Sequence, residues 1–200
     1  MQTKNIVILS VIGLGAVLLA SSAISNYNSL VPAEEKVNIS YAQYQNQLKR
    51  QADLIPNLAE ITKGYMTSEQ KTMIETATAR AGDAAKMKPS DVANNPELQK
   101  KLVEAQAQMG RAMATINATR EAYPELKASK QIDSLMVEVA GTQNRITVAR
   151  GNNQKAVNEF NLEVRQFPRV IVAKLIGFSA KPYYEATAEE QNAPKLNFSK

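Results

Sequence analysis

The sequence contains no cysteine, no histidine and no tryptophan. Without cysteine and histidine the chain has no disulfides, no thiol nucleophile, no imidazole general base and no zinc site of the usual kinds. Glycine-rich phosphate loops, GxSxG elbows and HExxH pairs are also absent, and no pair of acids has the apolar neighbours that raise a carboxyl pKa. We therefore predict a protein that is not an enzyme, with no catalytic, cofactor-binding or metal-ligating residues, no cofactor and no small-molecule substrate.

Aromatic residues are few, at 6% of the 200 residues. Alanine, leucine, valine and methionine supply the apolar mass between many Glu, Gln and Lys residues, a composition that favours helix over sheet. Two hundred residues suffice for one compact domain and leave no room for two large ones. The composition therefore predicts a single all-α domain.

Neither sign of charge is in large excess. The chain has 24 basic and 19 acidic residues, a net charge of +5. Lys4 is the only charged residue before position 25, which leaves 23 basic and 19 acidic residues, or +4, for the rest. Because these charges are scattered, we expect no nucleic acid as a partner, whereas an anionic lipid surface is compatible with them.

One long stretch has no charge at all. Residues 5–24, NIVILSVIGLGAVLLASSAI, are dominated by Ile, Val, Leu and Ala. Twenty helical residues span about 30 Å, the thickness of the hydrocarbon core of a bilayer. We predict a single transmembrane anchor over 5–24 after a short tail, 1–4; a cleaved signal peptide is the alternative, since Lys4 and the small residues 20–23 fit its two ends. The flanking charges weakly favour the outer side of the membrane for the rest of the chain.

Beyond this stretch the apolar residues recur with helical spacing in three limbs. The first limb is expected to begin near Pro32, because proline is tolerated in a first helical turn. Its buried stripe consists of Val37, Tyr41, Tyr44, Leu48, Ile55, Leu58 and Tyr65. Pro56 and Asn57 are expected to bend this helix, with a binding notch as the alternative.

The second and third limbs are also predicted to be helical. The second limb begins at Thr67 or Ser68 with a capping box, and the loop 86–97 is expected to split this descending limb or to bulge from it. The third limb has the most regular repeat, with the three-and-four spacing of a coiled coil: Ile132, Leu135, Val139, Thr142, Ile146, Ala149, Asn153, Ala156 and Phe160. The limbs predict an antiparallel up-down bundle of three to four long helices over 25–178, behind one N-terminal transmembrane helix, with 179–200 as a largely irregular tail.

Three segments of the first limb resemble a known family. QLKR, ADLIPNL and KGY, all within residues 47–65, look like the signature of the LemA family. The third limb matches further family positions at Asn144, Arg145, Ile146, Ala149, Arg150, Ala156, Val157, Asn161, Phe167 and Pro168. It departs from the family at Asn153 and Gln154, where the family often has a Tyr-Asn pair. Asn153 is thereby a polar residue on the core stripe that needs a hydrogen-bond partner. LemA proteins are small bacterial membrane-anchored helical proteins without an established activity, so the resemblance implies an anchored helical body at a bacterial cell membrane.

Charged and amide side chains crowd the middle of the first limb. In an up-down-up arrangement the first and third limbs run parallel. This direction brings Asp53 and Asn57 roughly level with Arg145 and Arg150. We hypothesise one interhelical polar network that consists of Arg50, Asp53, Asn57, Asn144, Arg145 and Arg150. The network either fixes helix register or docks a partner helix or a lipid headgroup. A register role predicts that Asp53→Ala lowers the melting temperature by several degrees.

Residues 167–178 are strongly apolar but too short to span a bilayer. We expect a short helix that closes one end of the bundle; the alternative is an interfacial helix in the headgroup layer, with Arg169 and Lys174 extended toward water.

The predicted function is a non-enzymatic membrane-anchored scaffold or adaptor of the bacterial envelope. It would act through other envelope proteins or through self-association as a homo-oligomer. The alternative is a lipid-binding or membrane-shaping helical bundle, since the surface is basic and residues 167–178 are apolar.

Overall fold

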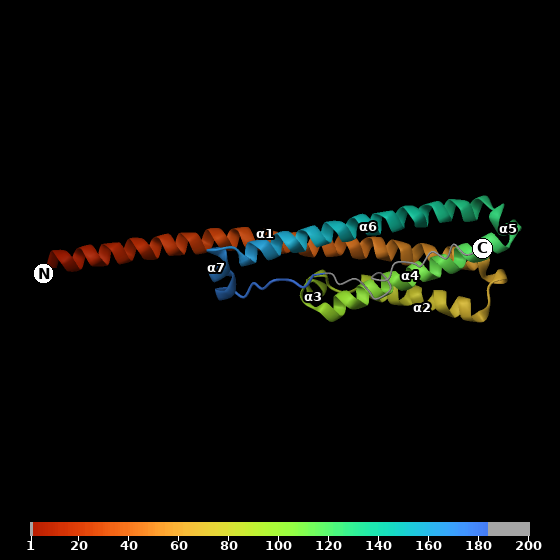
Figure 1. Cartoon of the computed structure of the whole chain (residues 1–200), viewed down its shortest axis with the longest axis horizontal. Helices are drawn as coiled ribbons and strands as arrows, with labels where there is room; N and C mark the ends of the chain where they lie inside the picture. The colour runs from red at the N-terminus through yellow and green to blue at the C-terminus, as the bar shows by residue number, and fades with distance from the viewer. Residues whose placement is uncertain (1, 184–200) are drawn as a thin grey trace, which may run out of the picture.

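The computed structural model describes residues 2–183, and the side chains of 12–183 other than 16 and 19. All regular elements in this range are helices: α1 Gln2–Thr62, the 3-10 helix η1 Lys63–Tyr65, α2 Ser68–Ala85, α3 Pro89–Asn94, α4 Pro96–Ala122, α5 Pro124–Lys127, α6 Lys130–Arg165 and α7 Arg169–Leu175 (Figure 1). The all-α prediction is confirmed. We call residues 25–183 the helical body.

α1 is one uninterrupted helix of 61 residues, about 90 Å long at 1.5 Å per residue. Its N-terminal part projects beyond the other helices (Figure 1). The prediction of a separate helix that starts near Pro32 is wrong, because the helix continues through Pro32. A proline inside a helix loses one backbone hydrogen bond, and the full burial of Leu30 and Val37 on either side offsets that loss.

α6 runs antiparallel to α1. Arg50 bonds to Glu138 at 2.9 Å, Ser40 to Asn153 at 2.9 Å, and Lys36 pairs with Glu159. Residue numbers thus fall on α1 as they rise on α6. The predicted parallel direction of these two limbs is wrong.

The segment between α2 and α4 explains this difference. Lys88 and Asn95 have extended backbones, and Pro89 and Pro96 each open a new helix after them. The chain therefore reverses at α3, and α4 returns toward the end at which α2 began (Figure 1). The predicted single descending limb is in fact two antiparallel helices, so α6 is the fourth long helix rather than the third.

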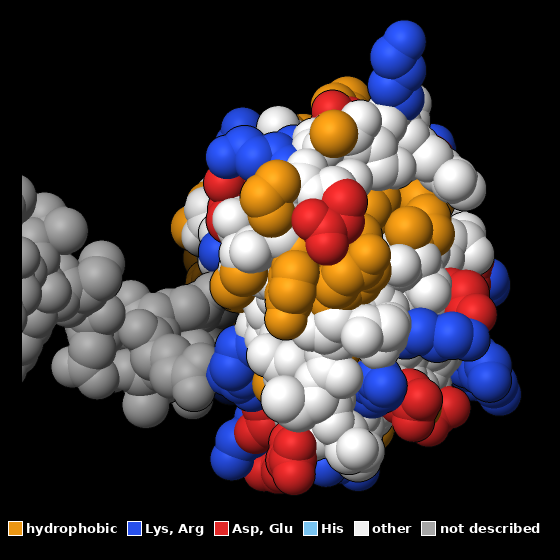
Figure 2. All heavy atoms as spheres, turned by 90° about the vertical axis from the view of Figure 1, so that its right-hand side faces the viewer, with side chains coloured by type: hydrophobic (Ala, Val, Ile, Leu, Met, Phe, Trp, Pro, Cys, Tyr) orange, Lys and Arg blue, Asp and Glu red, His pale blue; other side chains and the backbone are white. Residues whose placement is uncertain are grey.

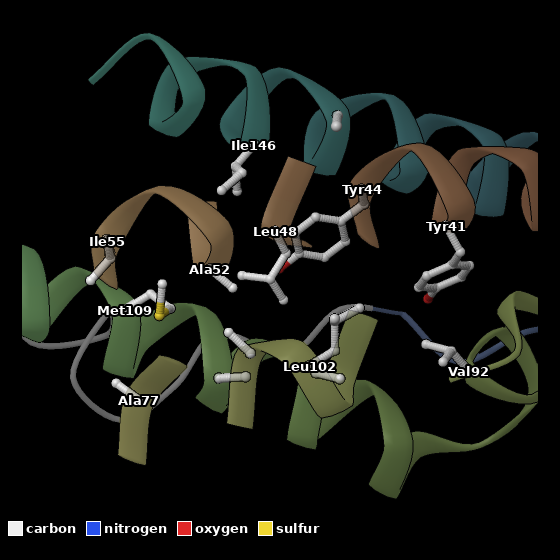
Figure 3. Packing of buried hydrophobic residues seen from close by; sticks show 14 of the residues in the cluster. Tyr41, Tyr44, Leu48, Ala52, Ile55, Ala77, Val92, Leu102, Met109 and Ile146 are labelled. Carbon is white, nitrogen blue, oxygen red and sulfur yellow. The ribbon is translucent and has the colours of Figure 1, made fainter. Parts of the chain in front are cut away.

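α1 lies between α6 and the pair formed by α2 and α4 (Figure 3). Tyr41, Tyr44 and Leu48 point from α1 toward α2 and α4, while Ile146 points from α6 toward α1 (Figure 3). The predicted stripe of α1 is buried except for Tyr65, and the predicted stripe of α6 is buried except for Leu135, which is half-buried. The apolar repeat therefore identified the buried face of both helices, although not every residue on it.

The helix boundaries follow local capping rules. The Thr67 hydroxyl accepts the N–H of Gln70, whose side chain accepts the N–H of Thr67, as predicted for a capping box. Asn95 accepts the N–H of Glu97 at 2.9 Å at the start of α4. These caps satisfy backbone donors that the first turns of α2 and α4 leave without partners.

Candidate interaction surfaces

The six residues of the hypothesised polar network lie on α1 and α6, and all but Arg150 are exposed. Arg50 bonds to Glu138, Asp53 to Lys49, and Arg145 to Gln47 and Thr142. These bonds place Arg145 beside α1, but one turn or more from Asp53. The antiparallel direction is the reason, because it places Arg150 between the levels of Ser40 and Gln47, away from Asp53.

This exposure reduces the contribution that Asp53 is expected to make to the stability of the folded protein. Its pair with Lys49 spans one helical turn, with both side chains more than half exposed. Such pairs contribute about 0.3–0.5 kcal/mol to stability. The several-degree loss predicted for Asp53→Ala therefore loses its physical basis, while an interaction role for these six residues stays a prediction.

Buried polar side chains of α1 hold the other helices instead. Gln45 donates to the backbone oxygens of Ala84 and Met87, both at 3.0 Å, and so satisfies carbonyls at the C-terminal end of α2. Tyr44 donates to Gln106 on α4, and Gln51 donates to Gln143 on α6 at 2.9 Å. α1 is thus bonded to each of the other long helices.

Ser40 and Asn153 form a further buried pair. The Asn153 amide donates to the Ser40 hydroxyl, which in turn donates to the backbone oxygen of Val37 at 2.7 Å. The predicted need of Asn153 for a partner on the core stripe is therefore met by α1. A paired polar group of this kind stabilises one alignment of two helices, because any shift leaves it unpaired.

Lys181 is the most buried charged residue in the described part of the chain, with 5% of its surface exposed. Its ammonium group pairs with Glu34 on α1, donates to Asn94 on α3 at 2.6 Å, and lies 5.2 Å from the centre of the Phe160 ring. Its backbone N–H and C=O both bond to the side chain of Asn161, at 2.7 and 2.8 Å. The cluster ties the segment after α7 to α1, α3 and α6.

Sequence reasoning missed Lys181 and Gln45 and gave Asn161 no structural role. Residues 179–183 are irregular in backbone, yet Lys181 is part of the core. The only sequence signal for the burial of Gln45 is its position next to Tyr44, which belongs to the buried stripe. Nothing local marks Lys181, because its partners are 20 to 147 positions away. Residues 184–200 of the predicted tail lie outside the described residues.

Two grooves open on the surface of the body. One, of about 650 Å³, lies between α2 and α4 and is lined by Ser68, Glu69, Thr72, Met73, Thr76, Ala77, Arg80, Gln108 and Arg111. The other, of about 440 Å³, lies between the end of α1 and α2, with Pro56 and Met66 in its lining. Among the described residues no three acids gather in a way that would hold a metal ion. Neither lining therefore contains a described group of side chains that would hold a metal ion.

The pKa values of Tyr41, Glu69 and Glu121 differ from those of the free side chains. Burial raises the pKa of Tyr41, because the ionised phenol would lose its hydration. The backbone N–H of Glu69 itself, followed by the Thr67 hydroxyl, lowers the pKa of the exposed Glu69 carboxyl. Lys127 lowers the pKa of Glu121 through a hydrogen bond and through its charge. The two carboxyl shifts arise at exposed helix ends, so they reflect capping and ion pairing.

The end of the body far from the N-terminus has an apolar surface. Hydrophobic side chains gather near the centre of this face, with charged side chains around them (Figure 2). η1, α5 and the first turns of α2 and α6 lie at this end (Figure 1). Tyr65 and Tyr123 are both 37% exposed here, with ring centres 4.7 Å apart. We call Tyr65, Tyr123 and the exposed Met73 the far-end surface; paired exposed aromatics are typical of protein interfaces.

Known proteins are similar to this chain over most of its length. The model of the LemA family matches residues 40–198. Magnetosome protein MamQ 2 of Paramagnetospirillum magneticum is 23% identical over 188 residues, an alignment that covers 86% of this chain and 69% of that protein. Magnetosome protein MamQ of Magnetospirillum gryphiswaldense is 20% identical over 187 residues, with the same coverage.

Proposed function

This chain belongs to the LemA family, and from that premise we propose that it is a membrane-anchored, non-enzymatic scaffold of the bacterial envelope. The scaffold holds a rigid helical body beside the membrane and offers the far-end surface to another envelope protein or to a second copy of the chain. Two relatives are named as magnetosome proteins, and neither name includes an enzymatic activity.

The membrane part of the proposal rests on residues 5–24. By length and composition, the helical stretch Ile12–Tyr65 is the one in the described chain that is long and apolar enough to cross a membrane. Only 6% of its apolar window is buried in the structure, so this window has no protein core around it. We propose that it crosses the bilayer once. The flanking charges favour the outer side for the body, which protease cleavage in intact cells tests.

The continuity of α1 is the observation that carries the scaffold role. The same helix forms the proposed anchor and the centre of the body, with no loop between them. From Ile24 to Thr62, 38 residues at 1.5 Å per residue carry the far-end surface about 55 Å from the anchor. A bilayer-embedded N-terminal part therefore fixes both the distance and the direction of the far-end surface.

Site-specific photocrosslinking in native membranes tests the scaffold role. A photoreactive residue in place of Tyr123 is expected to give a discrete crosslinked product, since this side chain lies in the far-end surface. The same residue in place of Asn57 tests the interaction role of the six-residue network. Glu104, exposed on α4 away from both surfaces, is the control position.

A single product from position 123 and none from position 104 supports the scaffold. Its mass distinguishes a second copy from another envelope protein. If only the monomer is recovered from every position, the scaffold role is wrong.

A further inference from the structure

α7 has an apolar face that no other described residue covers. Phe167, Ile171 and Leu175 are 82%, 53% and 81% exposed, and Ile176 beside them is also exposed. Ala173, on the opposite side of this short helix, is fully buried. Large apolar side chains grouped in this way indicate a surface that contacts something other than water.

The local structure fixes this face in place. Gly177 has a φ of 84°, the left-handed conformation that ends α7. The N–H of Phe178 bonds to the Ala173 oxygen at 2.9 Å, as in a Schellman motif. The Phe178 ring packs on Tyr27 of α1 and Phe160 of α6, at 6.4 and 6.2 Å between ring centres. α7 is therefore docked on the body by one side while its apolar face points away.

The position of α7 suggests what that face contacts. Tyr27 follows the end of the apolar stretch at Ile24 by three residues, about 4.5 Å along the helix axis. α7 lies at the end of the body nearest the N-terminal part of α1 and turns across the long axis of the body (Figure 1). A membrane crossed by residues 5–24 would have its surface at this level, where tyrosine is enriched.

The charges around α7 match an anionic surface. Arg165 and Lys174 are both exposed and lie next to these apolar residues in the sequence, and Arg169 pairs with Glu163 at 3.0 Å. Residues 162–178 contain three basic residues and one acid. Apolar side chains flanked by basic ones are typical of helices that lie in the headgroup layer. So short a helix binds weakly alone, but a neighbouring anchor makes its contact intramolecular.

We propose that α7 rests on the bilayer that α1 crosses, with Phe167, Ile171 and Leu175 inserted among the headgroups of phospholipids and Arg165 and Lys174 beside anionic ones. The contact is a second point of attachment, so it fixes the rotation and tilt of the body relative to the membrane. The inference rests on the proposed crossing by α1 and adds a lipid contact to it.

Single tryptophans test the contact, because the chain has none of its own. The full chain is reconstituted in vesicles of phosphatidylcholine and phosphatidylglycerol with and without brominated acyl chains, which quench nearby tryptophan. Leu175→Trp is the reporter on α7, and Leu18→Trp reports on the anchor. Val137→Trp is the matched control, since Val137 is 73% exposed on α6 at the far end.

We expect Leu175→Trp to emit at shorter wavelength than Val137→Trp and to be quenched by brominated lipid, while Val137→Trp keeps its emission. Replacing Lys174 and Arg165 with glutamine in the Leu175→Trp chain should reduce this quenching in anionic vesicles.

Quenching of Leu18→Trp without quenching of Leu175→Trp would overturn the α7 contact alone. A Leu175→Trp shielded from water but not quenched by lipid would mean that protein covers the face, which also overturns it. If Leu18→Trp is unquenched, both the crossing and the contact are wrong.

Discussion

Asn161 bonds through one side chain to both backbone groups of Lys181, twenty positions later. These two hydrogen bonds replace those that a neighbouring β-strand would form, and they hold the irregular segment around Lys181 against α6. It also positions the Lys181 ammonium group beside Glu34 and Asn94. A single amide therefore supports a buried charge, which is costly unless it is paired.

Asn161→Ala is expected to destabilise the protein by about 2–4 kcal/mol, because it leaves two buried backbone groups without partners. Thermal unfolding of the full chain in detergent, followed by circular dichroism, measures the loss. Asn158→Ala is the control, since Asn158 is exposed on the same helix. Equal melting temperatures of the two variants would show that Asn161 does not hold the segment.

Tyr41 predicts how stability depends on alkaline pH. Burial raises its pKa, so the folded state keeps the phenol proton at a pH where the unfolded state, with a pKa of about 10, has lost it. Stability is then lost as pH rises above about 10. Tyr41→Phe should reduce the decline in urea midpoint between pH 9 and about 11, whereas Tyr183→Phe, at an exposed site, should not. An unchanged decline in Tyr41→Phe would contradict a buried neutral phenol.

At the scale of elements, the direction of α6 decides which residues meet. The apolar repeat predicts the buried face of α6 but not its direction. A helix can pack the same apolar face on its neighbour whether the two run parallel or antiparallel. The reversal at α3 sets that direction, and it depends on contacts such as that of Gln45 with the end of α2.

Paired cysteines test this direction in a chain that has none. Lys36→Cys with Glu159→Cys should be joined by a short crosslinker that reacts with two thiols, because the long native side chains at these positions reach each other in an ion pair. Asp53→Cys with Arg150→Cys should not, although parallel helices would bring these positions together. Crosslinking of the second pair in preference to the first would show that α1 and α6 run parallel.

At the scale of the whole molecule, the long α1 makes the body and its proposed anchor one rigid unit. A bundle on a flexible linker would sample many orientations above a membrane, whereas a continuous helix permits few. The α7 contact would restrict the remaining rotation.

A flexible insertion tests this rigidity. Seven Gly and Ser residues between Ser25 and Asn26 should let the far end approach the membrane and raise energy transfer from a dye on Tyr123→Cys to acceptor lipids. Seven alanine-rich helical residues are the control, which lengthens α1 by about 10 Å and keeps transfer low. High transfer already in the chain without insertion would mean that the body lies flat on the bilayer.

The sequence by itself determined the all-α class, the capping box at Thr67 and the buried stripes of α1 and α6, because helical spacing and capping are local properties that a few neighbouring residues encode. It also identified the family, through the motifs of residues 47–65. Only the tertiary structure decided the continuity of α1 through Pro32, the antiparallel direction of α6 and the burial of Lys181. Each of these depends on side chains far apart in the chain, whose contacts outweigh a local signal such as a helix-initiating proline. The partners of the exposed network residues also depended on the tertiary structure. The charge of a side chain does not determine whether its partner lies on another helix or one turn away on the same helix.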